Sequence, residues 1–168
     1  PGPVLIDIPK DVTGAECEFL PKGKVEVHET YDISEEQLKT VAEMLDKAER
    51  PFIYYGGGVE LSDAGEALLA LMRKAEVPSA HTMMAIGCVP DDDPLSLGMI
   101  GMHGTVSADW AVERSDLLLC IGARFSDRVA TNTGHFAPGA RIIHVDIDAA
   151  EINKNIDTTF SVVSDAKT

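Results

Sequence analysis

Cysteine, aromatic residues and long apolar runs are scarce in this 168-residue sequence. The 3 cysteines (Cys17, Cys88 and Cys120) are far apart and never form a C-x-x-C pair, so neither a disulfide framework nor a thiolate metal site is expected. This usage favours a reducing compartment: the cytoplasm or, in a eukaryote, the interior of a plastid or mitochondrion. The longest apolar runs, such as 67–72 and 117–121, are far shorter than the roughly 20 residues of a membrane-spanning helix.

Basic residues are also few, with 14 Lys and Arg against 28 Asp and Glu and a net charge of −14. Such a chain repels phosphate backbones and anionic membranes, which argues against nucleic-acid and membrane partners. The composition, 45% hydrophobic and 25% charged, is typical of a globular protein. Because the sequence has no initiator Met and begins inside a predicted strand at 4–8, we expect it to belong to a longer chain.

Short apolar runs alternate with segments of helical periodicity. Ser34 and Gln37 form a predicted capping box for a helix that ends near residue 49, and Asp63 is a candidate cap for the next helix. Thr105 or Ser107 is a candidate cap for a third, and 149–153 is a predicted helical turn. Buried strands are predicted at 51–55, 77–81, 117–122, 141–148 and 160–163.

This alternation predicts an α/β fold with a doubly wound, mostly parallel, Rossmann-like sheet flanked by helices. The segment 13–32 has no sustained period and reads as an interdomain linker. Two aperiodic stretches, 82–104 and 123–139, follow strands. Because ligands of such folds bind at the carboxyl ends of strands, the first is predicted to be a binding loop.

Glycine clusters mark two of these strand ends. The triplet 56–58 follows a predicted strand, where a backbone can approach a ligand, although a tight turn explains it equally well. It does not match G-x-G-x-x-G, so an ordinary nicotinamide site is weakly supported. The GMHGT segment at 101–105 precedes a helix whose N-terminus would favour a diphosphate. His103 has the alternative of a packing or surface role, and Met102 that of a core residue.

Charged residues mark the other strand ends. Arg124 and Arg128 would supply a local positive field for an anionic ligand; ion pairs with Asp127 are the alternative. Asp146, near the end of its strand, is a candidate for binding ribose hydroxyls. A metal site built from His144, Asp146 and Asp148 is a weaker alternative, and 91–93 is interpreted as a solvated charge run.

Several motifs together resemble the catalytic subunit of acetolactate synthase (acetohydroxyacid synthase), a thiamine diphosphate enzyme. They follow one another along almost the whole chain. The two most specific are GMHGT and GARF-x-DRV. The others are GPVLIDIPKDV, the strand with its glycine triplet at 51–58, TMMAIG, LGMIGMHGT, SDLLLCIGARFSDRV and IIHVDIDAAEINKN.

The resemblance implies a three-domain parent. Residues 1–12 would end its pyrimidine-binding domain, 13–33 would be the linker, and 34–168 the central FAD-binding domain. The thiamine diphosphate and Mg²⁺ motifs would lie in the flanking domains, so we expect the fragment alone to be inactive. The parent would condense two pyruvates, or pyruvate and 2-oxobutyrate, with loss of carbon dioxide in branched-chain amino acid biosynthesis. The FAD would be structural, and the subunits would form homo-oligomers with a possible regulatory subunit.

Matching the family's motifs position by position implies a set of FAD contacts and a substrate channel. Two departures occur: Ser126 stands where the family usually has Asp, and Ala130-Thr131 replaces Thr-Gly. The family's flavin-binding arginine would precede Pro1. The alternatives are the central domain of another thiamine diphosphate lyase or oxidase, and a free-standing nucleotide-binding module. The implied channel residues are Met102, Asp127 and Arg128, and the implied FAD contacts are Gly57, Gly58, Thr82, Met83, Gly101, Met102, His103, Gly122, Ala123, Arg124, Asp146, Ile147 and Asp165.

Overall fold

A computed structural model describes residues 3–21 and 33–168 of the chain. Residues 33–168 contain a six-stranded sheet in which every neighbouring pair is parallel. Its spatial order is β3-β2-β1-β4-β5-β6, so the direction of progression reverses between β1 and β4. The strands are β1 (Pro51–Tyr55), β2 (Ser79–His81), β3 (Ser96–Met99), β4 (Leu117–Ile121), β5 (Arg141–Asp146) and β6 (Phe160–Val163).

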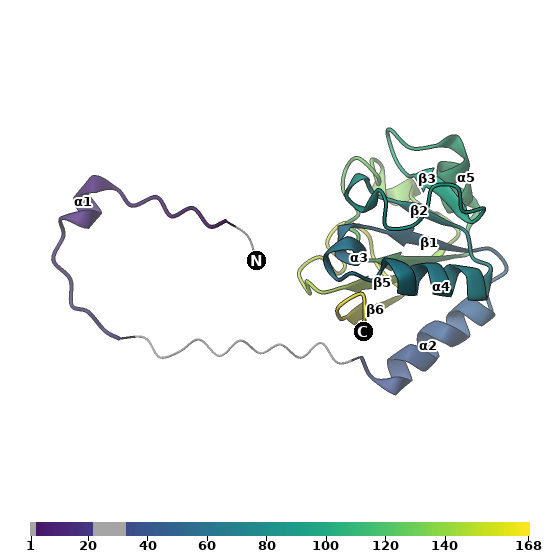
Figure 1. Ribbon diagram of the computed structural model, residues 1–168, viewed down its shortest axis with the longest axis horizontal. Helices are drawn as coiled ribbons and strands as arrows, with labels where there is room; N and C mark the ends of the chain where they lie inside the picture. Colours follow the sequence, from purple (N-terminus) through teal and green to yellow (C-terminus); the bar gives the residue numbers. More distant parts are fainter. Residues whose placement is uncertain (1–2, 22–32) are drawn as a thin grey trace.

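Helices cover both faces of this sheet (Figure 1). One face packs against α2 (Glu35–Asp46), α3 (Gly57–Leu61) and α4 (Gly65–Ala75). The other packs against α5 (Val106–Arg114) and the irregular chain after β4. The predicted doubly wound α/β fold is therefore confirmed.

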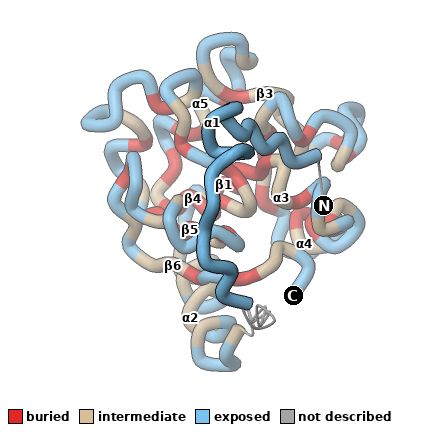
Figure 2. Tube along the Cα trace, turned by 90° about the vertical axis from the view of Figure 1, so that its left-hand side faces the viewer, coloured by how far each residue is buried: buried red, intermediate tan, exposed pale blue. Residues whose placement is uncertain are grey.

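Alternation along the strands divides the core into two layers. In β1, Phe52 and Tyr54 belong to the cluster on the α5 side, whereas Ile53 and Tyr55 belong to the cluster under α2 and α4. All four are at most 1% exposed, as a parallel sheet covered on both faces requires. Figure 2 shows the buried segments in the interior of the domain and the exposed segments around them. No helix in the described residues combines the length and apolar character needed to cross a bilayer.

Local capping signals explain two helix starts. Ser34 Oγ accepts from the N–H of Gln37 (3.1 Å) and Gln37 Oε1 accepts from the N–H of Ser34 (3.0 Å), which confirms the capping box. Thr105, rather than Ser107, caps α5 by accepting from the N–H of Ala108 (3.2 Å).

The cap predicted at Asp63 is wrong. Asp63 adopts a positive φ of 54°, the N-cap of α4 is Ala64, and no side chain caps this helix. The Asp63 carboxylate instead accepts from Lys167 Nζ at 2.8 Å. The solvated charge run is wrong at Asp93, whose buried carboxylate pairs with Arg73 (2.8 Å).

The predicted strand at 4–8 does not form in the described residues. Residues 3–9 have no regular structure, and the short helix α1 (Lys10–Thr13) follows. All residues from 3 to 21 are exposed (Figure 2). A strand needs a partner for its backbone groups, and no strand of the described sheet pairs with this segment.

Smaller differences concern the segments predicted to lie between the strands. β3 lies inside the segment predicted to be entirely loop, and α3 begins within the glycine triplet. The segment 149–153, predicted to be a helical turn, forms hydrogen-bonded turns. The 3-10 helices η1 (Met83–Ala85) and η2 (Thr133–His135) break the two predicted irregular stretches. The linker prediction falls partly on 22–32, outside the described residues.

Candidate functional site

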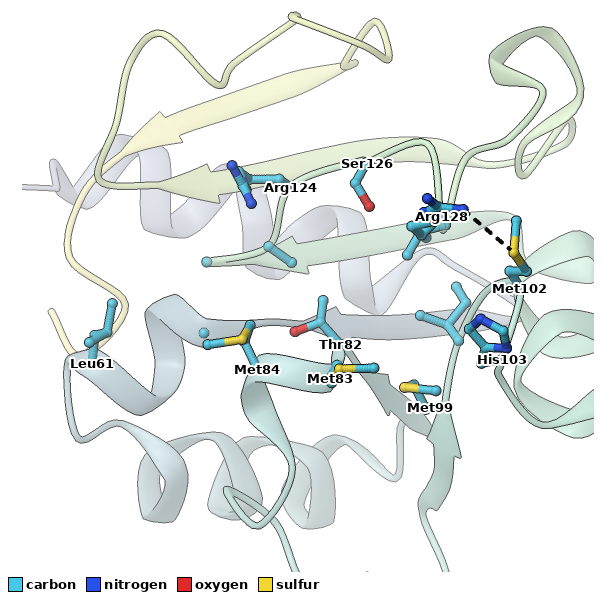
Figure 3. A pocket seen from close by; sticks show the side chains of 15 residues that line it. Leu61, Thr82, Met83, Met84, Met99, Met102, His103, Arg124, Ser126 and Arg128 are labelled. Atoms are coloured by element: carbon cyan, nitrogen blue, oxygen red, sulfur yellow. Dashed lines mark hydrogen bonds between the residues drawn. The ribbon is translucent and has the colours of Figure 1, made fainter.

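A cleft of about 540 Å³ opens at the carboxyl ends of β1, β2 and β4, around the point where the strand order reverses. Open α/β sheets bind their ligands at such a reversal. Segments far apart in the sequence build this cleft (Figure 3). Its lining consists of Gly57, Leu61, Thr82, Met83, Met84, Met99, Ile100, Met102, His103, Gly122, Ala123, Arg124, Ser126, Arg128 and Val129.

Close backbone packing forms the base of the cleft. The Gly58 N–H donates to the Gly122 carbonyl at 2.9 Å, and a Cβ on Gly58 would lie 2.6 Å from Gly122 Cα. Gly122 has φ +56°, a conformation that suits glycine. The glycine triplet thus makes a tight strand-to-helix turn, while its middle member Gly57 also faces the cleft.

One wall of the cleft is cationic. Arg124, Ser126 and Arg128 lie along the segment after β4 (Figure 3). Within the described chain, the Arg124 guanidinium makes no hydrogen bond or ion pair; Arg128 Nε lies 4.0 Å from the Asp127 carboxylate, and both side chains are largely exposed. An exposed pair at that distance contributes little. No acidic residue lines the cleft, so its local charge is positive in a chain of net charge −14.

The opposite wall is rich in methionine. Met83, Met84 and Met99 lie across from the arginines, and Met102 and His103 lie at one end (Figure 3). Thr82, on the same wall, has a buried hydroxyl that finds no hydrogen-bond partner among the described residues. Methionine packs well against flat rings because its side chain is flexible and polarisable.

The two walls together fit an anionic ligand that carries a flat ring system. Guanidinium groups match phosphate oxygens, methionines match a ring, and the unpaired Thr82 hydroxyl can donate to or accept from a polar edge. A volume of about 540 Å³ lies within the usual range for cofactor sites. The residues present therefore fit a nucleotide-type cofactor such as FAD.

Most of the residues implied as FAD contacts line this cleft. Gly58 lies beneath it, and Gly101 packs against the Arg128 carbonyl, where a Cβ would approach to 2.5 Å. Asp127 is exposed beside Arg128. The implied contacts that the structure brings to the cleft are Gly57, Thr82, Met83, Met102, His103, Gly122, Ala123 and Arg124, together with the channel residue Arg128.

Besides Gly58 and Gly101, three more implied contacts do not line the cleft: Asp146, Ile147 and Asp165. Asp146 ends β5, and Asp165 follows β6. Burial acts to raise the pKa of Asp146, but the neighbouring His144 ring and the N–H of Asp148 outweigh it and hold that pKa below its usual value. Asp146 is thus an anion at neutral pH, and its Oδ2 lies 3.8 Å from His144 Nε2.

The alternative of a metal site at these residues receives no support. Asp148 lies beyond the end of β5 and its side chain accepts from the N–H of Ala150. In residues 3–21 and 33–168, no group of three or more His, Cys, Asp or Glu side chains is placed to hold a metal ion.

Sequence reasoning from single residues missed much of the apolar lining: Leu61, Met84, Met99, Ile100 and Val129. Met84 and Ile100 lie inside motifs that carried the family resemblance, which is the signal that indicated their neighbourhood. Leu61 is 90% exposed and ends α3, a helix that the sequence did not predict. Nothing in the local pattern marks it as a lining residue.

Comparison with known proteins shows which family the sequence resembles. Residues 38–168 match a family model described as the thiamine pyrophosphate enzyme, central domain. The chain is 46% identical to a probable acetolactate synthase large subunit of Methanocaldococcus jannaschii, over 99% of the chain and 29% of the relative. It is 45% identical to the acetolactate synthase large subunit of Corynebacterium glutamicum, over 99% and 27%. For the isozyme 1 large subunit of Escherichia coli, the values are 47%, 92% and 27%. The chain thus spans less than a third of the length of these relatives.

Proposed function

The chain belongs to the family of thiamine pyrophosphate enzyme central domains, and from that premise we propose that it is the FAD-binding central domain of an acetolactate synthase large subunit. Sequence identities of 45–47% to three relatives named as acetolactate synthase large subunits support this assignment within the family. No observation favours a different thiamine diphosphate lyase or oxidase, or a free-standing nucleotide-binding module.

One observation supports FAD above all: the cleft at the reversal of strand order places Arg124, which has no polar partner in the described chain, and the exposed Arg128 opposite a methionine wall. Arg124 and Arg128 would bind the FAD phosphates or other electron-rich oxygen atoms of the cofactor. The methionines opposite would pack against its flat ring system. The buried Thr82 hydroxyl would gain the hydrogen bond it lacks. When bound, FAD would serve as a structural element and would not transfer hydride in the reaction.

For the whole protein, we propose decarboxylative condensation of two 2-oxo acids, with thiamine diphosphate and Mg²⁺ held outside residues 34–168. Met102, Asp127 and Arg128 would lie at the entrance for these substrates, where a cation suits a carboxylate. The relatives are named large subunits, which supports assembly with a second kind of subunit, and we propose homo-oligomers of the catalytic subunit. The three cysteines are free, which agrees with a reducing interior such as the cytoplasm, a plastid or a mitochondrion.

A calorimetric titration of FAD into the 168-residue chain tests the cofactor assignment. We expect saturable binding that weakens by about tenfold or more in Arg124→Ala, because a charge-assisted hydrogen bond contributes about 1.5–3 kcal/mol. Arg141→Ala is the matched control: Arg141 is exposed and begins β5, at the edge of the sheet opposite the cleft.

The two variants remove the same charge, so a general electrostatic effect would weaken both equally. Saturable binding lost only in Arg124→Ala supports the assignment. Equal effects of the two variants, or no saturable binding of FAD by the unmodified chain, would overturn it.

A further inference from the structure

Buried side chains from two strands converge on the Ala123 carbonyl, directly after β4. His144 Nε2 lies 3.0 Å from this oxygen, and Cys120 Sγ donates to it at 3.2 Å. A carbonyl oxygen can only accept, so Nε2 of His144 carries the hydrogen. Nδ1 of the same ring is buried without a partner.

The next two carbonyls are held in the same way by other elements. The Tyr54 hydroxyl, from β1, donates to the Arg124 carbonyl at 3.2 Å. Asn155 Nδ2, from the turn before β6, donates to the Phe125 carbonyl at 2.8 Å. Three consecutive carbonyls of the segment after β4 are therefore fixed by side chains from four elements.

Burial strengthens the contacts made by Tyr54, Cys120 and His144. Tyr54 and Cys120 are fully buried and His144 is 1% exposed, so a lost contact cannot be replaced by bulk water. Burial also raises the pKa values of Tyr54 and Cys120, which keeps both groups protonated and able to donate.

Ring packing fixes the residue that follows Arg124. The Phe125 ring lies 5.9 Å from Tyr54, 5.2 Å from His144 and 5.6 Å from Phe136, measured between centroids. These distances are typical of favourable aromatic pairs. The backbone on both sides of Arg124 is therefore anchored in the core.

The Arg124 side chain, in contrast, has no hydrogen bond or ion pair within the described chain to orient it. Only its backbone sets the direction from which the guanidinium enters the cleft. We propose that Tyr54, Cys120, His144 and Asn155 are positioning residues, a brace that holds the segment 122–126 so that Arg124 is presented to an anionic cofactor. This inference rests on the proposed FAD site.

The chain offers a matched pair of variants. Tyr54→Phe removes the hydroxyl that holds the Arg124 carbonyl. Tyr55→Phe removes the hydroxyl of the next residue, which is equally buried, lies on the other face of the sheet and has no hydrogen-bond partner. Both changes delete one buried oxygen atom from the same strand, and only Tyr54→Phe removes a contact with the segment after β4.

Two measurements separate positioning from general stability. Hydrogen exchange in the ligand-free chain should become about fivefold faster in the peptide that covers 122–130 in Tyr54→Phe, with the rates of β1 and β5 little changed. FAD affinity should fall about three- to tenfold in the same variant. Tyr55→Phe should match the unmodified chain in both.

Asn155→Ala is a second variant that tests the brace without changing the buried aromatic rings around Phe125. It should also speed exchange at 122–130, by about threefold, because it frees the Phe125 carbonyl. If exchange there is unchanged in both Tyr54→Phe and Asn155→Ala, the brace does not exist.

The outcomes distinguish this inference from the proposed function. Faster exchange with unchanged FAD affinity overturns the positioning role while leaving FAD binding intact. Failure of the unmodified chain to bind FAD overturns the proposed function, and the exchange data then still decide whether the brace holds the segment.

Discussion

The parallel strands all begin along one side of the sheet, called here the amino edge, and end along the other, the carboxyl edge. Polar groups at these two edges have different roles. At the amino edge, both Asp116 carboxylate oxygens accept backbone N–H groups, of Glu49 and Arg50, at 2.8 Å. Arg50 Nε donates to the Arg114 carbonyl, and the Arg114 guanidinium lies 4.2 Å from the centre of the Trp110 ring. At the carboxyl edge, Arg124 has no such partner. At the amino edge, Asp116, Arg50 and Arg114 thus help to close the fold, whereas at the carboxyl edge Arg124 is available to a ligand.

The space around the glycines also differs between the two edges. At the carboxyl edge, Gly58 and Gly122 touch backbone to backbone, with no room for a Cβ. At the amino edge, a Cβ on Gly139 would lie 3.8 Å from the Ser115 carbonyl, an ordinary contact. Close approach is therefore required where the cleft is built, and it is absent where the chain merely turns into β5.

Gly58→Ala should have the largest effect on stability. Its Cβ would press on Gly122 Cα, which is backbone and cannot rotate away, so we expect a loss of about 2 kcal/mol or more in the free energy of unfolding. The gain in helix propensity for a residue in α3, about 1 kcal/mol at most, would not compensate for it. Chemical denaturation of the chain measures this loss.

Gly139→Ala is the control at the amino edge. It should change the free energy of unfolding by no more than about 0.5 kcal/mol. Equal losses in the two variants would mean that close packing does not distinguish the two edges.

Asp116→Asn should lower the free energy of unfolding by about 0.5–1 kcal/mol at pH 7, because the amide keeps only one acceptor oxygen for two N–H groups. The N–H groups of Glu49 and Arg50 hold the pKa of Asp116 below its usual value. Stability from a depressed carboxyl pKa is complete above the unfolded value near 4 and declines as the pH falls through the folded value. Denaturation at pH 7 and pH 3 should show the difference between unmodified chain and variant shrinking.

Asp127→Asn removes the same charge beside the cleft. Asp127 is exposed and paired only at 4.0 Å, so stability should stay within about 0.5 kcal/mol at both pH values. If this variant loses as much stability as Asp116→Asn, carboxylates at the two edges do not have different roles.

The fold was largely predictable where one local signal decides the structure. Apolar runs such as 51–55 and 117–121 became buried parallel strands, and Ser34 and Thr105 became helix caps. β3 was missed because Ser96–Met99 is only half-buried and contains Gly98. The strand predicted at 4–8 shows the converse: an apolar run forms no strand without a partner for its backbone.

The site was partly predictable for a topological reason. Parallel strands bring their carboxyl ends to one edge, so the residues after β1 and β4 meet there whatever lies between them in the sequence. The same reasoning does not say which side chains turn inward at that edge. Asp146, for example, turns toward His144. The helix α3, which ends in Leu61, packs through Gly58 against Gly122, a residue 64 positions later in the sequence.

Ser126→Glu should produce the smallest effect and sharpen the comparison at the carboxyl edge itself. Ser126 lies between Arg124 and Arg128 on the cationic wall (Figure 3). A glutamate carboxylate, on a side chain longer than the Asp that the family usually has, would engage the Arg124 guanidinium, as Asp116 engages its partners at the amino edge. FAD affinity should fall about threefold at low salt, and the loss should shrink as salt screens the added charge. Ala70→Glu, on the exposed side of α4, adds the same charge away from the cleft and should leave the affinity unchanged. Equal affinity of Ser126→Glu and the unmodified chain at low salt would show that the free Arg124 guanidinium is not what makes this edge receptive.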